Sequence, residues 1–357
     1  MKRWYVVILA LLCVGVIAAD VMAAKKYEGE KMYVYAGIFP YSREFMMTYI
    51  APALKDKWGI DLVVEEVGSQ FMLEQMTINK NKPTVTIACM DVVIGQQAAA
   101  MGLTAPIDVT LAPNLEGLYD WARWEYEEQV HVLTTLVVGI GLLYNQKEFT
   151  KRGFAAPTSW QDLWRPELAG RISITAPEST WGTAALVGIA QWQGGSESNL
   201  EPGFAKLETL LPNIHTIHTW SSELVKLMQL GEVWLATTGS NMGPALQKEG
   251  FPAVWVAPAE GAPTANGGMV LVKNAPYQDV AYDFIDMFFS TEYLARRALW
   301  AGDVSPREDV WSILSPGDKA KLAFTNADFD KLVTQDWNII TKERAALIEE
   351  FHKRLPG

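Results

Sequence analysis

The chain has 357 residues, of which 41 are acidic and 30 are basic, and its formal net charge at pH 7 is −11. Phosphate backbones and anionic lipid repel a chain of this charge, so nucleic acid and anionic membrane surfaces are excluded as partners. Nearly half of the residues are hydrophobic, and the length is sufficient for two lobes of ordinary domain size.

The N-terminal segment has the three parts of a secretion signal. A Lys-Arg pair precedes an apolar run at 4–19, and the small-residue sequence Val-Met-Ala-Ala follows at 21–24. This order of charge, apolar run and small residues is typical of a signal peptide. We therefore predict that residues 1–24 are removed by cleavage after Ala23 or Ala24.

Two other interpretations of this segment are weaker. An uncleaved anchor needs about 20 apolar residues, more than the run provides. A lipoprotein would attach its lipid at Cys13, but Leu12 stands where a small residue is required. Residues 1–24 contain two basic residues and one acidic residue, so the mature chain has a net charge of −12 and one cysteine, Cys89. With no internal disulfide, the mature protein must be stabilised by its core.

The first half of the chain alternates strand-like and helix-like segments. Strands are expected at 31–37, 60–67 and 85–89, and helices at 44–58, 71–79 and from 92 to 101. The first helix is interrupted by Pro52, and Ser42 is a candidate for its N-cap. This alternation predicts a parallel or mixed sheet that is covered by helices.

A long apolar stretch at 132–144, which contains Gly139 and Gly141, has the character of a strand that passes from one lobe to the other. A second α/β block follows it. Strands are expected at 171–175, 231–237, 252–257 and 268–273, and helices at 180–193, 204–211, 221–230, 277–289 and 316–355. Two such blocks joined by crossing strands predict a ligand cleft at the carboxyl ends of the strands.

Four segments resemble those of a known family. They are Gly-Leu-Leu-Tyr-Asn-Gln-Lys-Glu-Phe at 141–149, Pro-Thr-Ser-Trp-Gln-Asp-Leu-Trp-Arg-Pro-Glu-Leu-Ala-Gly-Arg at 157–171, Leu-Met-Gln-Leu-Gly-Glu-Val at 227–233, and the helix-like run at 273–290. With these segments the chain resembles the family 1 extracellular solute-binding proteins of ABC importers, and within them the spermidine/putrescine-binding branch. The resemblance implies an α/β, two-lobed type II periplasmic binding protein whose ligand cleft lies between lobes joined by crossing strands.

The resemblance also implies a role. A monomeric periplasmic protein without cofactor or catalytic activity would capture a small-molecule solute, close about a hinge, and deliver the solute to a membrane permease and its ATPase. Lobe one would comprise residues 27–134 plus 265–302, and lobe two residues 135–264 plus 303–357. Signalling through a membrane receptor is an alternative to import that the sequence leaves open.

The first lobe provides four candidate ligand residues. Phe39, Tyr41 and Ser42 lie in or beside the loop after the first strand, where ligand contacts are common. An ordinary strand-to-helix turn would have the same composition. Asp91 follows the third strand, and it is either a cleft carboxylate or the cap of the next helix.

In the second lobe, Glu178, Ser179, Thr180 and Trp181 lie between a strand and a helix. The resemblance places acidic ligand residues here, but only Glu178 is acidic. The others would form a helix N-terminus that can bind an anion, with Trp181 as an aromatic platform. A plain N-cap at Ser179 or Thr180 is the alternative.

Two features of the polyamine site are missing from this sequence. Thr238, Ser240 and Asn241 stand where polyamine binders of the family place a stacking tryptophan, and Asn266 takes the place of an aspartate. Hydroxyl and amide groups suit a ligand that carries a carboxylate, phosphonate or phosphate better than a dication. A true spermidine or putrescine binder remains the alternative. Replacing Trp181 or Asn266 by Ala is expected to weaken ligand binding and to leave folding intact.

Other function classes find little support. His215 and His218 are spaced like metal ligands, but no further ligand completes a set, so a surface pair is expected and no metal site is predicted. The adjacent tyrosine pair of ferric-ion binders in related proteins does not occur, and neither do a nucleophile elbow, a P-loop or a dinucleotide-binding motif. Ferric-ion binding and a secreted enzyme are therefore the weaker alternatives.

Overall fold

The computed structural model describes residues 25–37, 42–301, 304–319, 322, 331–333 and 335–355. The predicted signal peptide at 1–24 and the candidate residues Phe39 and Tyr41 lie outside these described residues. None of the helices in the described part of the chain combines the length and the apolar character needed to cross a membrane.

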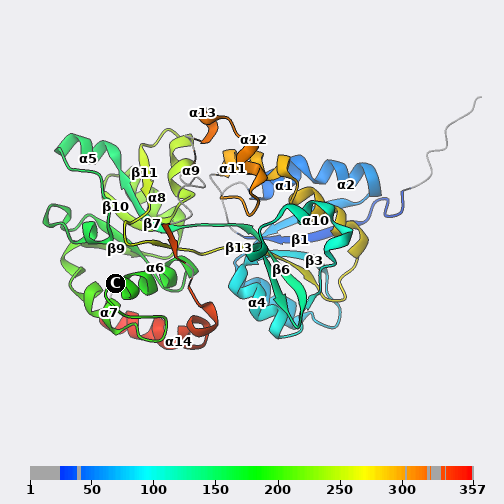
Figure 1. Cartoon of the computed structure of the whole chain (residues 1–357), viewed down its shortest axis with the longest axis horizontal. Coiled ribbons are helices and arrows are strands. Elements are labelled where there is room, and N and C mark those ends of the chain that lie inside the picture. The colour runs from blue at the N-terminus through cyan, green and yellow to red at the C-terminus, as the bar shows by residue number, and fades with distance from the viewer. Residues whose placement is uncertain are drawn as a thin grey trace, which may run out of the picture.

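The first lobe is built on a mixed sheet with the strand order β2-β1-β3-β13-β6-β5, and β4 pairs with β13. Its strands are β1 (Lys31–Ala36), β2 (Asp61–Glu66), β3 (Val85–Asp91), β4 (Thr104–Ala105), β5 (Arg123–Tyr126), β6 (Gln129–Leu136) and β13 (Gly267–Val272). Its helices are α1 (Ser42–Tyr49), α2 (Ala51–Trp58), α3 (Ser69–Ile78), α4 (Val92–Ala100), α10 (Gln278–Phe288) and α11 (Thr291–Ala301). The helices α3 and α4 pack on one face of the sheet, and α1, α10 and α11 pack on the other (Figure 1).

The second lobe has a sheet with the order β11-β7-β10-β8-β9. Its strands are β7 (Ile140–Asn145), β8 (Ile172–Thr175), β9 (Ile214–His218), β10 (Leu235–Gly239) and β11 (Ala253–Val256). Its helices are α5 (Gln146–Arg152), α6 (Thr180–Trp192), α7 (Glu201–Glu208), α8 (Ser221–Gln229), α9 (Met242–Lys248) and α14 (Trp337–Arg354). Apolar side chains of α6, α7 and α14 pack with those of β7 and β8 in one core cluster.

Two segments cross side by side between the lobes (Figure 1). One, at 137–139, joins β6 to β7, and the other, at 264–266, joins β12 (Ala262–Pro263) to β13. Gly139 and Thr264 form an antiparallel bridge, and the Ala265 N–H donates to the Val138 carbonyl at 2.9 Å. The passage predicted at 132–144 is therefore found, but it consists of two strands in different sheets with a short crossing between them, rather than one strand.

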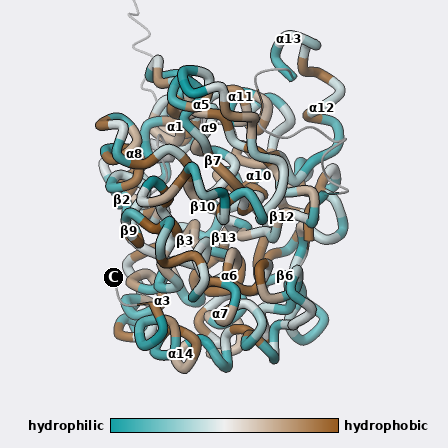
Figure 2. The backbone as a smooth tube through the Cα atoms, turned by 90° about the vertical axis from the view of Figure 1, so that its left-hand side faces the viewer, coloured by the Kyte–Doolittle hydropathy of each residue, from teal (hydrophilic) through white to brown (hydrophobic). Residues whose placement is uncertain are grey.

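The C-terminal part departs from the predicted helix at 316–355. It comprises α12 (Asp309–Ile313), α13 (Pro316–Lys319), the strand β14 (Leu332–Val333), which pairs with β12, and α14. The helices α12 and α13 lie at the edge of the molecule (Figure 2). Within the range predicted for lobe two, 303–357, Arg307 donates to the Phe289 carbonyl of lobe one at 2.8 Å, and the division of the chain into lobes stays a prediction.

Candidate functional site

The two lobes meet where β3 of lobe one ends opposite the start of α6 in lobe two. Thr180 Oγ1 donates to Asp91 Oδ2 at 3.3 Å across this junction, and the Asp91 backbone N–H donates to Ser69 Oγ at 3.0 Å. Asp91 occupies the N-cap position of α4, but its side chain makes no capping hydrogen bond. Of the two roles that the sequence leaves open, the structure thus favours a carboxylate directed at the other lobe.

The surroundings of Asp91 shift its proton affinity. Burial raises the pKa of the Asp91 carboxyl, while hydrogen bonds from Thr180 and Ser69 and the charge of Arg344 oppose that rise. A partly desolvated carboxylate of this kind needs donors or a positive charge to stay ionised. The junction therefore contains polar and charged side chains, whereas the interior around it is mostly apolar.

The start of α6 is fixed by local backbone packing. Ser179 is the N-cap, and its side chain accepts from the Trp181 N–H at 3.2 Å, so the N-cap interpretation of this segment is confirmed. Gly182 has no Cβ, and a Cβ there would lie 2.0 Å from the carbonyl oxygen of Ala176. Only glycine lets the first turn of α6 approach the end of β8 this closely.

Arg344 of α14 brings a positive charge to the junction. Its Nη2 donates to the Glu178 carbonyl at 2.8 Å, while the side chain of Glu178 is exposed and contacts His352. Burial lowers the pKa of the Arg344 guanidinium, and the charges of Asp91 and Glu178 oppose that shift. The sequence gives no signal for Arg344, because it lies more than 160 residues from the segment that it joins.

Several side-chain polar atoms of the candidate residues and of the C-terminal part of the chain are buried without a hydrogen-bond partner among the described residues. They are Asn266 Oδ1, Asn241 Oδ1, Thr238 Oγ1, Gln335 Oε1 and Arg344 Nε. Buried polar atoms in native proteins are nearly always paired with protein, water or ligand, so each such atom needs an explanation. Three of these residues were singled out from the sequence, whereas Gln335 and Arg344 were missed.

The other candidates have structural contacts. Ser240 Oγ accepts from the Gly139 N–H at 3.2 Å, so this hydroxyl holds the crossing segment in place. The Trp181 ring lies against the end of β10, because a Cβ at Gly239 would be 2.8 Å from it, and its residue is only 9% exposed. The Trp181 side chain is therefore largely buried in the core, and its role as an aromatic platform stays a prediction. The side chain of Ser42, like Phe39 and Tyr41, lies outside the described residues, although the backbone of Ser42 begins α1 as predicted.

His215 and His218 both lie on β9, but they differ in burial. His218 is buried, with Nδ1 2.7 Å from Ser173 Oγ and Nε2 3.2 Å from Thr175 Oγ1, whereas His215 is exposed. The expected surface pair is therefore wrong for His218. Among the described residues, no group of three or more His, Cys, Asp or Glu side chains is placed to hold a metal ion.

The comparisons with known proteins agree with an architecture of two α/β lobes that meet at a polar junction. A family model described as bacterial extracellular solute-binding protein matches residues 21–323. The chain belongs to this family. Members of this family are solute-binding proteins rather than enzymes, which agrees with the expected absence of catalysis.

Relatives with curated names are more distant. The spermidine/putrescine-binding periplasmic protein of Escherichia coli is 22% identical over 200 residues, which are 56% of each chain. The spermidine/putrescine-binding periplasmic protein 1 of Haemophilus influenzae is 24% identical over 169 residues, which are 46% of this chain and 45% of that protein. The chain thus spans about half the length of the curated relatives it matches.

Solved structures match over nearly their whole length. The periplasmic binding protein AfuA of Actinobacillus pleuropneumoniae, with fructose-6-phosphate bound, has a TM-score of 0.73 and 20% identity over 92% of this chain and 99% of its own. The spermidine/putrescine substrate-binding protein of Streptococcus pneumoniae has a TM-score of 0.74 and 20% identity over 91% and 99%. At this identity the matches establish the two-lobed fold and leave the ligand open.

Proposed function

We propose that this protein is the periplasmic substrate-binding component of an ABC importer. It would take up a small polar solute between its lobes and deliver the solute to a membrane permease with its ATPase. The observation that carries the proposal is the junction at which Asp91 of one lobe meets Thr180 of the other, at the carboxyl end of β3. A solute bound at such a junction contacts both lobes at once, which is what couples binding to closure.

We further propose that the solute carries a carboxylate, phosphonate or phosphate group. A dication needs excess negative charge and aromatic faces in a desolvated site. Here Arg344 lies close enough to Asp91 and Glu178 to offset part of their charge. Trp181, the one aromatic candidate among the described residues, packs in the core, and the N-terminus of α6 adds a positive dipole end.

A polyamine is the second candidate, and Asp91 is the observation in its favour. Its carboxylate lies at the junction, and the relatives from Escherichia coli and Haemophilus influenzae are named for spermidine and putrescine. If Arg344 turned away, Asp91 and Glu178 would provide two negative charges for the ends of a diamine.

Titration calorimetry with two groups of solutes separates these candidates. Spermidine and putrescine form one group, and sugar phosphates, phosphonates and carboxylates form the other. We expect heat from a member of the second group. We also expect Asn266→Ala to weaken its binding by about fivefold, because one hydrogen bond is worth roughly 1 kcal/mol. The matched control is Gln161→Ala, which removes an amide from an exposed position. Unchanged affinity in Asn266→Ala would contradict this placement of the site.

A further inference from the structure

Arg344 of α14 is held at the junction by backbone carbonyls and not by an acid. Its Nη2 donates to the Glu178 carbonyl at 2.8 Å and to the Pro177 carbonyl at 3.5 Å. The Glu178 carboxylate contacts His352 instead, and no acidic side chain in the described part of the chain forms an ion pair with Arg344. Its Nε is buried and has no hydrogen-bond partner among those residues. The guanidinium therefore keeps a positive charge that no carboxylate there neutralises by contact.

A charge in this position is costly for the fold. The side chain of Arg344 is partly buried, and burial lowers the pKa of its guanidinium. Buried charges in native proteins are normally paired, because an ion loses its hydration when it leaves water. Charged groups in such surroundings are frequent at functional sites. The unpaired guanidinium is therefore a candidate for a role in solute binding.

The guanidinium belongs to lobe two, but its charge also acts on lobe one. The Glu178 carbonyl that it holds lies two residues before Thr180, whose Oγ1 donates to Asp91 of lobe one. The helix α14 also lies against α4, which begins directly after Asp91. The charges of Arg344 and Asp91 each oppose the shift that burial imposes on the pKa of the other. A solute bound at Asp91 and Thr180 thus lies in the field of both charges.

We propose that Arg344 determines the sign of the charge that a solute can bring to this junction. Asp91 alone would attract a cation. With the guanidinium in place the two side-chain charges offset each other, and the N-terminus of α6 adds a positive dipole end, so an oxyanion is favoured over an ammonium. The carboxylate of Glu178 is exposed and directed at His352, so solvent screens it. This inference rests on the proposed function and names the residue that makes the site select an acidic solute.

The test removes the charge of Arg344 and compares the result with the removal of an equal charge nearby. Arg344→Gln takes away the guanidinium charge and keeps an amide that can donate to a backbone carbonyl. Lys342→Gln takes away an exposed charge two residues earlier on the same helix. The probes are inorganic phosphate, methylphosphonate and acetate as anions, and putrescine and spermidine as cations. Calorimetry measures their dissociation constants at one fixed pH and ionic strength.

We expect the unaltered protein to bind at least one of the anions more tightly than either amine. Arg344→Gln should weaken binding of that anion about tenfold and strengthen binding of putrescine by a similar factor, because the charge of Asp91 then acts without opposition. Lys342→Gln should change neither. Opposite changes for anions and cations identify a charge effect, since a purely structural loss weakens both. Equal weakening of both classes, or an unchanged preference, would overturn the proposal.

Two further variants complete the test. Arg344→Lys keeps the charge and loses the forked geometry, so it should retain the preference for the anion, and a reversed preference would contradict the proposal. If Arg344→Gln does not fold, Asp91→Asn removes the opposing charge instead. It should bind the anion more tightly, and unchanged or weaker binding would overturn the proposal.

Failure of this proposal differs from failure of the proposed function. An anion that binds Arg344→Gln and the unaltered protein with equal affinity would retire the role of Arg344 and keep the binding role. If none of the five probes bound the unaltered protein, both the role of Arg344 and the acidic solute would be retired.

Discussion

His218 shows how a single buried residue makes the stability of this protein depend on pH. Burial between Ser173 and Thr175 lowers the pKa of His218 to about 4, from an ordinary value of about 6.5. The unfolded chain therefore binds a proton more readily than the folded chain. The neutral imidazole stabilises the fold fully above pH 6.5, and this contribution is lost as the pH falls towards 4.

We expect the free energy of unfolding to fall by roughly 3 kcal/mol from this residue alone between pH 7 and pH 4, since one pKa unit corresponds to about 1.4 kcal/mol. Urea unfolding at several pH values measures it. His218→Gln should reduce the slope against pH, whereas His215→Gln on the exposed side of the same strand should keep it. Equal slopes in all three proteins would contradict the assignment, because a purely structural loss lowers stability without changing its slope.

Trp181 and Asn266 differ in what their substitution is expected to change, folding stability for Trp181 and ligand binding for Asn266. The Trp181 ring fills the core beside Gly239, so Trp181→Ala is expected to lower the free energy of unfolding by about 3–5 kcal/mol through the cavity that it leaves. Trp181→Ala is thus expected to affect folding, contrary to the expectation from the sequence, while the role of Trp181 as a ligand platform stays a prediction. Asn266 remains the better residue for testing ligand binding, because its backbone carbonyl keeps its bond from the Val92 N–H after substitution.

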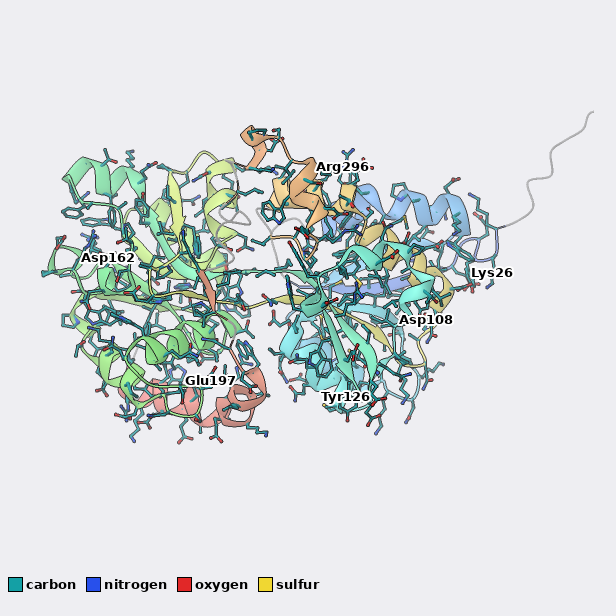
Figure 3. The ribbon with its side chains drawn as sticks, viewed as in Figure 1. Lys26, Asp108, Tyr126, Asp162, Glu197 and Arg296 are labelled. Carbon is teal, nitrogen blue, oxygen red and sulfur yellow. The ribbon has the colours of Figure 1, made fainter. Side chains whose placement is uncertain are left out.

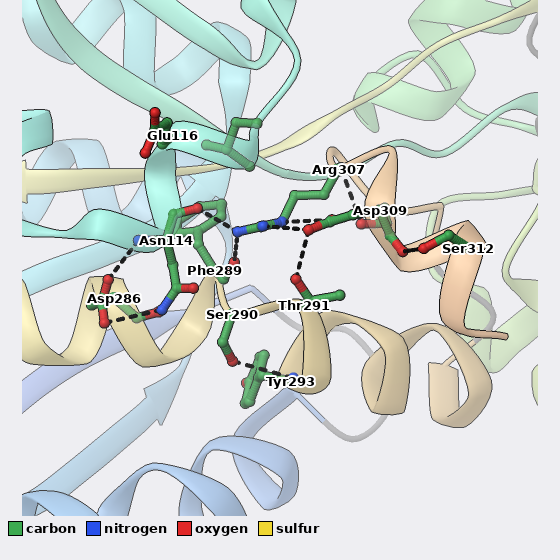
Figure 4. A network of polar contacts seen from close by, with 12 residues as sticks. Asn114, Glu116, Asp286, Phe289, Ser290, Thr291, Tyr293, Arg307, Asp309 and Ser312 are labelled. Atoms are coloured by element: carbon green, nitrogen blue, oxygen red, sulfur yellow. Dashed lines mark hydrogen bonds and ion pairs between the residues drawn. The ribbon is translucent and has the colours of Figure 1, made fainter.

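At the scale of elements, an arginine joins two segments of lobe one to α12. Arg307 Nη1 donates to the Phe289 and Asn114 carbonyls, and its Nε and Nη2 donate to the two carboxylate oxygens of Asp309 (Figure 4). Thr291 Oγ1 donates to the same carboxylate at 2.7 Å. A Cβ at Gly117 would lie 2.2 Å from the Arg307 guanidinium, so the glycine makes room for it.

Removing this arginine should loosen the chain as it leaves α11. Arg307→Met is expected to lower the free energy of unfolding by roughly 3–5 kcal/mol, because it leaves buried carbonyls without a donor. Chemical denaturation measures the loss. The control, Arg296→Gln, breaks an exposed ion pair of the same lobe (Figure 3) and should leave the free energy of unfolding almost unchanged. A loss in Arg307→Met as small as in the control would show that the network is not needed.

The sequence predicted elements better than it predicted the contacts between them. Short, nearly continuous runs of apolar residues identified β1, β3 and β13 nearly to their ends. A strand that is buried on both faces is apolar at almost every position, so it can be recognised from the local sequence. The pattern failed after residue 316, where α13, β14 and α14 replace one expected helix. There the chain packs against distant elements, and β14 exists only because it pairs with β12.

The candidate site was partly predictable for the same reason. The topology places Asp91, Thr180 and Asn266 at one edge of the sheets, because each of them lies near an end of a strand. Arg344 comes from a helix whose periodicity indicates which face is apolar but not which residues that face contacts. Long-range contacts of this kind leave no mark in the local sequence.

For the whole molecule, we propose that the two crossing segments act as a hinge. A solute that contacts both lobes favours their closed arrangement over the open one. We expect small-angle scattering to give a smaller radius of gyration when a solute that binds in calorimetry is added. A related compound that does not bind serves as the control. Identical scattering with and without the binding solute would contradict closure about the hinge.

The most direct measurement of the central claim is native mass spectrometry of the mature protein, followed by denaturation and identification of any small molecule released. We predict the release of a solute with a carboxylate, phosphonate or phosphate group, bound one to one. Release of a diamine would contradict the assignment of an acidic solute and make Asp91 and Glu178 the residues that bind it.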